Sequence, residues 1–410
     1  MDLKDKFKIL SSSAKFDVAS EPSISTTLMN LEKNNTPGGI YYSRASNGGC
    51  APLLKVLFSN SCIYDCAYCI NRRSNNIPRA TFKMEELISL TLNLYKRKLI
   101  RGLFLSSAVF GSPNTTMTML YLTAKKLREE HNFPGYIHLK IIPGADLEII
   151  RKAGFYADRM SVNLELPSEK SLTYLAPDKN KSSILTPMNY VGKKYQESKE
   201  QKNKYKNSPI FIPGGQSTQL VIGASPESDF HIIKLVEKLY SNFHLTRVYY
   251  SAFQRVNEDP RLPNITNPSL LREHRLYQAD WLIRCYGFSS SDILNEEEKF
   301  LDEELDPKTK WALRNYHMFP IEINTAPYEL LIKVPGIGLK SAKKIVTSRK
   351  KSSLNFDNLK NIGVVLKRAK YFITCNGKYY GKIYNNPEIV KKLITSKKQT
   401  NSLQLSLFDN

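Results

Sequence analysis

The most informative stretch of this chain is the run Ser61-Cys62-Ile63-Tyr64-Asp65-Cys66-Ala67-Tyr68-Cys69. Its C-x3-C-x2-C spacing places three thiolates around one short loop, and thiolates prefer iron–sulfur clusters or zinc to hard cations. Three ligands on a cubane cluster would leave the fourth iron open to an external molecule. The run follows an apolar stretch at residues 52–58, which predicts a buried strand that leads directly into the cysteine loop.

Zinc is the weaker alternative for this loop. A structural zinc site takes four ligands, usually as two separated pairs. The six histidines show no paired spacing, and Cys50, Cys285 and Cys375 stand alone in the sequence. Cys50 lies at the opposite end of the predicted strand, so we do not expect it to be a fourth ligand. Cys285, on an apolar helix, is explained as a small buried hydrophobe.

The length and composition indicate a soluble, globular chain. Its 410 residues are enough for two or three domains, and 41% of them are hydrophobic. No stretch approaches the roughly 18 consecutive apolar residues of a membrane helix. Residues 1–8 are charged and lack the apolar core of a signal peptide. We therefore expect a cytoplasmic protein with no membrane association, whose clustered cysteines bind metal rather than form disulfides.

Positive charge is concentrated in two parts of the chain, although the net charge is +22 overall. Residues 340–400 hold 16 Lys and Arg against two acids, and residues 179–206 hold eight Lys against two acids. An AT-rich genome, which favours Lys and Asn everywhere, is the alternative explanation. The uneven distribution favours a polyanionic partner such as nucleic acid.

Residues 50–256 alternate short apolar runs with longer amphipathic ones, which predicts an α/β fold. The expected strands are residues 53–58, 102–107, 136–142, 159–165, 219–223 and 247–252, and helices at 83–98, 115–130, 146–153 and 227–240 lie between them. Six such units form a partial (β/α)6 barrel of the TIM type. The polar segment 179–208 is predicted to be a mobile, Lys-rich insertion before the fifth strand.

The alternation stops after residue 257, and four further regions are expected besides the barrel. Residues 1–49 precede it as an extension. Residues 257–318 form a helical linker region with helices at 269–286 and 308–317, and residues 319–375 form an all-α domain. Residues 376–410 form a basic tail.

Polar candidates for a site follow the predicted strands. Ser106 and Ser107 end the second strand, Asn163 and Glu165 lie on the fourth, and Gly223 ends the fifth. Chemistry in a barrel of parallel strands takes place at the carboxyl ends of the strands, where the cysteine loop also belongs. Each residue alone is a weak signal, because a single Asn or Glu at a strand end is more often a surface residue.

At family level, residues 50–255 resemble the core of radical S-adenosylmethionine (SAM) enzymes. Three motifs are similar to a bacterial family of radical SAM proteins named for DNA modification or repair: CIYDCAYCINRRSN at 62–75, GLFLSS at 102–107 and DRMSVNLE at 158–165. The similarity runs from about residue 3 to residue 380. The family's reaction is unassigned.

This resemblance implies a specific cofactor arrangement. Cys62, Cys66 and Cys69 would bind three irons of a [4Fe–4S] cluster, and the open iron would bind the amino and carboxylate groups of SAM. An electron from a reductant such as flavodoxin or ferredoxin would then cleave SAM to methionine and a 5′-deoxyadenosyl radical that abstracts a substrate hydrogen. The protein aims the radical, whose chemistry belongs to the cofactor.

The resemblance also suggests which residues contact SAM. Tyr68 stands where the family's adenine contact is common. Ser106 and Ser107 replace the Gly-Gly-Glu motif that contacts the SAM amino group. The resemblance therefore does not assign the contact to the amino group in this chain. Asn163 and Glu165 would face the ribose or methionine part, and Gly223 completes the cofactor-binding candidates.

A second motif indicates nucleic-acid binding. The turn Pro335-Gly336-Ile337-Gly338 joins two predicted helices, and its glycines allow close approach of another backbone. The helix that follows offers free N–H groups to a phosphate oxygen, with cations beside it at Lys340, Lys343 and Lys344. This pattern resembles the helix-hairpin-helix motif, which binds the DNA backbone without reading sequence. A bundle turn with no ligand is the alternative.

Two further segments complete the C-terminal part. Residues 356–369 resemble a degenerate second hairpin, which would pair with the first in one domain. The chain ends in Gln404-Leu405-Ser406-Leu407-Phe408 followed by two polar residues. This pentapeptide is similar to the peptide by which bacterial repair and replication proteins bind the sliding clamp, with Gln404, Leu405, Leu407 and Phe408 as the contacts. A frayed tail is the alternative.

Together these features lead to three hypotheses. The first is a radical SAM enzyme that repairs or modifies DNA. The second is an RNA-modifying radical SAM enzyme, because the hairpin and the basic runs would also suit structured RNA. The third is a non-catalytic DNA-binding protein whose iron–sulfur cluster is structural or redox-sensing.

Overall fold

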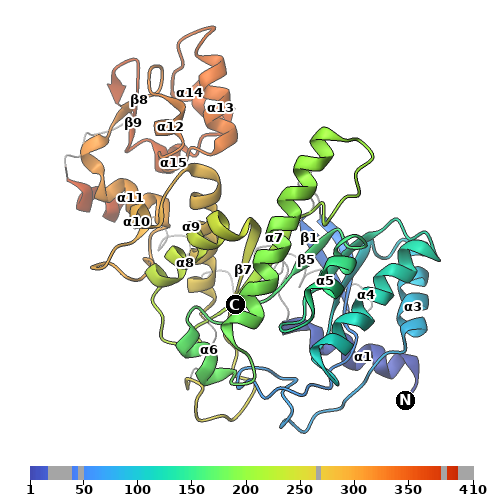
Figure 1. Ribbon diagram of the computed structural model, residues 1–410. Coiled ribbons are helices and arrows are strands. Elements are labelled where there is room, and N and C mark those ends of the chain that lie inside the picture. The colour runs from blue at the N-terminus through green and yellow to red at the C-terminus, as the bar shows by residue number, and fades with distance from the viewer. Residues whose placement is uncertain (17–38, 45–49, 265–268, 380–385, 396–410) are drawn as a thin grey trace, which may run out of the picture. The chain divides into compact units, whose positions relative to one another are not determined.

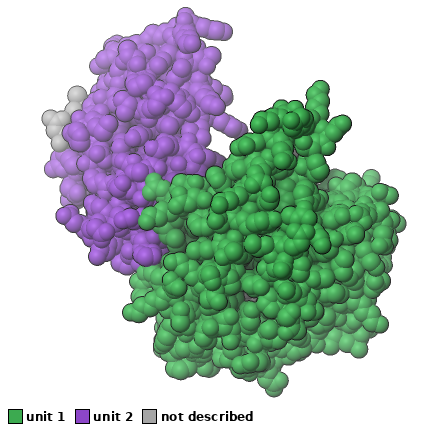
Figure 2. All heavy atoms as spheres, viewed as in Figure 1, with its two compact units in different colours: residues 1–227, 235–273 green, residues 228–234, 274–410 purple. Residues whose placement is uncertain are grey.

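The computed structural model describes residues 1–16, 39–44, 50–264, 269–379 and 386–395. The chain divides into two compact units, which Figure 2 colours separately. The first unit contains residues 1–227 and 235–273, and the second contains residues 228–234 and 274–410. The domain boundaries expected from composition at residues 256 and 318 stay predictions.

A seven-stranded sheet forms the centre of the first unit. Its strands are β1 (Ile40–Arg44), β2 (Cys50–Leu57), β3 (Gly102–Ser106), β4 (Tyr136–Lys140), β5 (Arg159–Ser161), β6 (Gln216–Ile222) and β7 (Leu245–Ala252). They follow one another in chain order from β1 to β7. Neighbours from β2 to β7 are parallel, whereas β1 is antiparallel to β2. The predicted α/β class with six parallel barrel strands is confirmed, and β1 adds an antiparallel strand that the sequence did not indicate.

Helices connect the parallel strands, as the alternating pattern predicts. They are α3 (Met84–Lys96), α4 (Pro113–Glu129), α5 (Leu147–Gly154), α6 (Glu169–Leu175), α7 (Lys181–Lys204) and α8 (Asp229–Phe243), and α1 (Leu3–Ser13) with η1 (Ala14–Phe16) precedes the sheet. Ser112 caps α4 through its side chain, and Asp146 caps α5 in the same way. Helices α3, α4 and α5 pack side by side in Figure 1.

The Lys-rich segment 179–208 is not the unstructured insertion that its composition suggests, because 24 of its residues form helix α7. Asn180 caps the helix by accepting a hydrogen bond from the backbone N–H of Ser183. Ile184, Met188 and Val191 recur at helical spacing and are fully buried. This apolar stripe stabilises the first half of α7, and the lysines occupy the rest of its surface.

The second unit is mainly helical. It contains most of α9 (Leu270–Tyr286), then α10 (Ser290–Ile293), α11 (Pro307–Arg314), η2 (Tyr316–Met318), α12 (Tyr328–Leu331), α13 (Leu339–Ser348), α14 (Phe356–Ile362) and α15 (Leu366–Ala369). The expected all-α region also carries a small sheet in the order β10 (Lys378–Tyr379), β9 (Ile373–Cys375) and β8 (Ile321–Glu322). Strands this short are not predictable from the sequence pattern.

Within the described part of the chain, we find no helix with the length and hydrophobicity needed to cross a bilayer.

Candidate functional site

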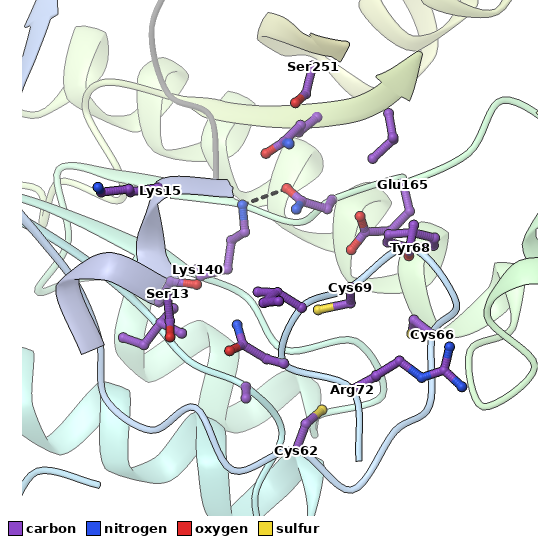
Figure 3. Close-up of a pocket in the computed structure, with 18 of the residues that line it drawn as sticks. Ser13, Lys15, Cys62, Cys66, Tyr68, Cys69, Arg72, Lys140, Glu165 and Ser251 are labelled. Atoms are coloured by element: carbon purple, nitrogen blue, oxygen red, sulfur yellow. Dashed lines mark hydrogen bonds between the residues drawn. The ribbon is translucent and has the colours of Figure 1, made fainter. Parts of the chain in front are cut away.

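Three cysteine side chains line one cavity in the first unit. Cys62, Cys66 and Cys69 lie on the loop after β2, and the cavity has a volume of about 430 Å³ (Figure 3). Cys66 is only 4% exposed. Burial raises the pKa of the Cys66 thiol, and it raises the pKa of the Cys69 thiol to about 12. Such thiols remain protonated at neutral pH unless a bound metal favours the thiolate.

Arg79 holds the cysteine loop closed through its guanidinium group. One nitrogen, Nη1, donates to the carbonyl oxygens of Asn60 (2.6 Å) and Asn71 (2.9 Å). The other, Nη2, donates to the carbonyl oxygens of Arg72 (2.6 Å) and Asn75 (2.9 Å). The rigid fork of the guanidinium thus ties together four points of the backbone on both sides of the cysteines.

Residues far along the chain fix the middle of the loop. The Asn257 side chain donates through Nδ2 to the carbonyl oxygens of Ala67 (2.6 Å) and Cys69 (3.0 Å). The backbone N–H of Asp65 donates to Oδ2 of Asp178 at 2.7 Å. Because these contacts come from segments that follow α6 and β7, the fold of the barrel positions the loop.

An ion-pair network covers the outer side of the loop. Arg72 contacts Asp65 at 2.9 Å and Asp259 at 2.7 Å, and Arg261 contacts Asp259 at 2.8 Å. Hydrogen bonds from Arg261 and from Arg72 hold the pKa of Asp259 well below its usual value. The carboxylate is therefore charged throughout the ordinary pH range, and the network remains intact there.

A buried ion pair lies beside the cysteines in the cavity wall. Lys179 Nζ is 2.8 Å from Oε1 of Glu165, and both side chains are about nine-tenths buried. Glu165 adopts a φ of +68°, which costs free energy in a non-glycine residue and is found most often at functional sites. Burial acts to lower the pKa of Lys179, but Glu165, Tyr68 and Cys66 outweigh this effect and raise that pKa well above its usual value. The lysine is thus a permanent cation next to the cysteine loop.

The cavity gathers five of the six predicted SAM-binding residues: Tyr68, Ser106, Ser107, Asn163 and Glu165. They come from the cysteine loop, the end of β3 and the segment after β5. Gly223 is not among the cavity-lining residues. It follows β6 with a φ of +91°, so its role there is to turn the chain after the strand.

Several residues that line the cavity were not predicted from the sequence, notably Lys55, Lys140, Lys179, Gln219 and Glu273. A lone lysine inside an otherwise apolar strand was the available signal for Lys55 on β2 and for Lys140 at the end of β4. Lys179 has no such signal, because it begins the Lys-rich run at residues 179–206, where the sequence does not distinguish a buried lysine from an exposed one. Glu273 lies on α9, and its carboxylate accepts a hydrogen bond from the backbone N–H of Ala252 at 2.6 Å.

The donor set of the cavity fits an iron–sulfur cluster. Across the described residues, no three His, Cys, Asp or Glu side chains converge closely enough for one metal ion. A cubane cluster makes a different demand, because each thiolate binds its own iron and the ligands surround the whole cluster. Three thiols from one loop share the cavity, and among the described residues the buried Tyr68 hydroxyl beside them has no hydrogen-bond partner.

The predicted hairpin lies in the second unit between α12 and α13 (Figure 1). Gly336 has a φ of +86°, and a Cβ there would lie 2.6 Å from the carbonyl oxygen of Val365, so the position requires glycine. Gly338 is the N-cap of α13. The Ile337 side chain is buried, which leaves only its backbone for a ligand.

Exposed cations follow the hairpin: Lys340, Lys343 and Lys344 on α13. A second turn, between α14 and α15, packs on the first. Gly363 ends α14 in the left-handed conformation, and the backbone N–H of Val365 donates to the carbonyl oxygen of Gly336 at 2.9 Å. The expected pairing of two hairpins therefore occurs.

Lys308 on α11 supports the first hairpin from within the second unit. Its Nζ donates to the carbonyl oxygen of Ile337 at 2.6 Å and lies 4.7 Å from the centroid of the Tyr286 ring. Burial lowers the pKa of Lys308 from its usual 10.5 to about 7. Asp306, on the same segment, opposes this effect.

The predicted clamp-binding residues Gln404, Leu405, Leu407 and Phe408 lie outside the described residues. Their role stays a prediction from the sequence.

Comparison with known proteins identifies one motif and several distant folds. Residues 319–367 match the helix-hairpin-helix motif family. No curated protein sequence matches the chain.

Among solved structures, the chain is similar to the FeFe-hydrogenase maturase HydG from Carboxydothermus hydrogenoformans, with 14% identity, a TM-score of 0.41 and coverage of 55% of this chain and 50% of that one. It is similar to Streptococcus suis SuiB bound to precursor peptide SuiA, with 12% identity, a TM-score of 0.38 and coverage of 62% and 49%. It is also similar to the cobalamin-dependent S-adenosylmethionine radical enzyme OxsB, with 12% identity, a TM-score of 0.33 and coverage of 94% and 63%. The chain spans about half the length of the HydG and SuiB chains.

Proposed function

We propose that this chain is a radical SAM enzyme that acts on nucleic acid, with DNA as the expected substrate for repair or modification. One observation carries the proposal: three thiols on the loop after β2 open into a cavity at the carboxyl ends of parallel strands. That is the edge of an α/β barrel at which polar groups from different strands meet.

The cofactors would be held by residues of one cavity wall. Cys62, Cys66 and Cys69 would bind the [4Fe–4S] cluster, and Tyr68, Asn163 and Glu165 would contact SAM. When bound and reduced by a donor, the pair supplies a 5′-deoxyadenosyl radical that abstracts hydrogen from the substrate.

The residues of the chain have three tasks around these cofactors. Arg79 and Asn257 fix the backbone of the loop, so the thiols are presented in one geometry. Burial of Cys66 limits access of water to the ligand set. The Lys179–Glu165 pair places a positive and a negative group side by side where a zwitterionic ligand such as the methionine part of SAM would lie.

Nucleic-acid binding is proposed for the second unit. The match to the helix-hairpin-helix family and the exposed Lys340, Lys343 and Lys344 beside the Gly336 turn support it. The helix N-terminus at Gly338 and the three cations are suited to backbone phosphates rather than to base edges. The exposed lysines account for binding without sequence preference.

The decisive experiment is anaerobic reconstitution of the chain with iron and sulfide, followed by reduction in the presence of SAM. We expect 5′-deoxyadenosine in wild type and none in Cys66→Ala. The matched control is Cys285→Ala on α9, which should retain full activity because Cys285 does not line the cavity.

Parallel reactions with duplex DNA, single-stranded DNA and structured RNA identify the substrate. Stimulation by DNA alone supports the proposal, and stimulation by RNA alone would replace DNA with RNA. A reconstituted wild type that contains the cluster but never cleaves SAM would favour a non-catalytic DNA-binding protein.

A further inference from the structure

The hydrogen bond from Lys308 to the first hairpin reaches the peptide group at which α13 begins. Lys308 Nζ donates to the carbonyl oxygen of Ile337 at 2.6 Å. The N–H of the same peptide group belongs to Gly338, the N-cap of α13. Because the carbonyl and the N–H of a trans peptide point in opposite directions, Lys308 and the Gly338 N–H lie on opposite sides of this peptide group.

The Gly338 N–H belongs to the groups that are proposed to bind backbone phosphate. The first four N–H groups of a helix have no acceptor within the helix. Among the described residues, no side chain caps α13. Three exposed cations, Lys340, Lys343 and Lys344, follow on the same helix. A phosphate oxygen is an acceptor that suits both the N–H groups and these cations.

Two contacts hold the Lys308 ammonium group beside the hairpin. One is the hydrogen bond to Ile337, and the other is the ring of Tyr286 on α9, whose centroid lies 4.7 Å from Nζ. The Tyr286 hydroxyl lies near the start of α13, since a Cβ added to Gly338 would be 3.8 Å from it. Lys308 and Tyr286 both precede residues 319–367, which match the helix-hairpin-helix family. They therefore support the motif from outside it.

The charged and titratable groups around Lys308 come from three elements. Asp306, the N-cap of α11, favours the charged form of Lys308. Arg368 on α15 pairs with Asp306 at 3.1 Å, and Arg275 on α9 interacts with the same carboxylate. Tyr286 contributes its ring from α9. Burial outweighs Asp306 and lowers the pKa of Lys308 to about 7, so the charge of this side chain changes near neutral pH.

The ammonium group of Lys308 has an effect on the hairpin that differs from its effect on stability. A pKa that is lower in the folded chain means that the charged form destabilises the fold. A cation on the Ile337 carbonyl, however, draws electron density from the peptide group and makes the Gly338 N–H a stronger hydrogen-bond donor. An anionic acceptor gains most, because its charge is also attracted by the ammonium group behind the peptide.

We infer that Lys308 is a positioning residue for nucleic-acid binding: its ammonium group orients and polarises the Ile337–Gly338 peptide group, whose N–H binds a backbone phosphate. The inference rests on the nucleic-acid binding proposed for the second unit and deepens it. Lys308 acts from the carbonyl side of the peptide group and does not contact the phosphate itself. Phosphate binding and protonation of Lys308 therefore favour each other.

The test measures the affinity of the full chain for labelled duplex DNA by fluorescence anisotropy. We expect Lys308→Met to weaken binding about fivefold at pH 6, where the wild-type side chain is charged. The ratio of wild-type affinity to variant affinity should fall towards one as the pH rises to 9, because Lys308 is then neutral. A lysine that only packs against the hairpin would give a ratio that does not change with pH.

Two matched variants separate this role from a general loss of charge. Lys310→Met removes a cation from the same helix, where Lys310 pairs with Glu298 at 3.2 Å and with Asp302 at 3.5 Å. This variant should bind DNA as wild type does. Lys308→Arg keeps a cation that stays charged at every pH used, so it should retain most of the affinity at pH 6 and lose none of it by pH 9.

The dependence of affinity on salt distinguishes positioning from direct contact. Loss of a lysine that contacts phosphate reduces the slope of log affinity against log salt concentration by about one. We expect Lys308→Met to keep the wild-type slope, because the residue neutralises no phosphate directly. A smaller slope in this variant would assign Lys308 to a phosphate contact and overturn the inference.

Two other results would refute the positioning role. The first is equal affinity of wild type and Lys308→Met at pH 6, and the second is a ratio of affinities that stays constant from pH 6 to pH 9. Should Lys308→Met fail to fold by circular dichroism, Lys308→Gln is measured in its place with the same expectations. Failure of wild type to bind either duplex DNA or structured RNA would instead refute the proposed nucleic-acid binding, so the two failures are distinguishable.

Discussion

At the scale of single residues, Lys179 and Glu165 form a buried ion pair in the cavity wall. Both side chains are about nine-tenths buried, so removal of one partner leaves an uncompensated charge in the interior. The unusual φ of +68° at Glu165 adds strain that the surrounding contacts must offset.

Replacement of the cation tests this pair. We expect Lys179→Met to lower the free energy of unfolding by about 3 kcal/mol, because the Glu165 carboxylate stays buried without its partner. Urea unfolding followed by circular dichroism measures the change, with both proteins in the same state of cofactor loading. The double variant Lys179→Met/Glu165→Gln should recover part of the loss. A single-variant effect below about 1 kcal/mol would show that water solvates the pair.

Lys308 predicts a pH dependence of stability in the second unit. Its pKa is lowered from 10.5 to about 7 in the folded chain, so the folded chain binds fewer protons than the unfolded chain between these values. The free energy of unfolding should therefore rise with pH across this window, by at most about 1.4 kcal/mol per pH unit. Below about pH 7, the buried Lys308 ammonium group destabilises the folded chain to its full extent.

The comparison with Lys308→Met isolates this effect. Both tryptophans of the chain, Trp281 and Trp311, lie in the second unit, so their fluorescence during urea unfolding reports on it. The stability of wild type relative to the variant should increase from pH 7 to pH 10 and be constant from pH 5.5 to pH 6.5. A difference in the free energy of unfolding between wild type and Lys308→Met that does not change with pH would contradict the lowered pKa of Lys308.

At the scale of elements, Arg79 holds the backbone of the cysteine loop at four points. Arg79→Met removes four hydrogen bonds to loop carbonyls. We expect iron content after reconstitution to fall about tenfold, with the circular dichroism spectrum retained, because the loop then samples many conformations. The matched control is Arg151→Met, whose guanidinium pairs with Glu148 on the surface of α5 and should leave iron content unchanged. Equal iron content in both variants would contradict the role of Arg79.

The strands were the most predictable elements. Each of β2 to β7 lies within a few residues of its predicted range, because each strand contains apolar residues at strand spacing between amphipathic helical segments. Helix α7 was mispredicted because lysines dominate its composition, although Ile184, Met188 and Val191 carry the helical spacing. Strands of two or three residues such as β8 and β9 have no periodicity to detect.

The site was predictable only where the signal is local. The three cysteines and the strand-end residues such as Asn163 follow directly from spacing and from strand position. Lys179 and Asn257 reach the loop through the tertiary fold, and nothing in their own sequence neighbourhood distinguishes them. The anchoring of the loop by Arg79 is likewise set by folding rather than by a motif.

At the scale of the whole molecule, the proposed chemistry belongs to the first unit and the proposed nucleic-acid binding to the second. We expect the triple variant Lys340→Glu/Lys343→Glu/Lys344→Glu to weaken DNA binding by at least about tenfold and to reduce the dependence of affinity on salt. SAM cleavage without DNA should equal that of wild type. Fluorescence anisotropy with labelled duplex DNA at several salt concentrations measures the first effect, and 5′-deoxyadenosine formation measures the second.

A second charge-reversal variant tests whether weaker DNA binding results only from the lower net charge of the chain. Lys193→Glu/Lys194→Glu/Lys199→Glu changes the same number of charges on α7 in the first unit. If both triple variants weaken DNA binding equally, net charge rather than the hairpin accounts for the affinity.

The contacts that hold the cysteine loop can form only after a late part of the chain has been translated. Asn257 lies 190 residues beyond Ala67, whose carbonyl oxygen it binds, and Asp259 lies 187 residues beyond Arg72. When the loop leaves the ribosome, most of the barrel that anchors it has not yet been translated. The proposed cluster would therefore be loaded after the barrel has been translated, and an iron–sulfur assembly machinery would meet a folded pocket rather than a nascent peptide.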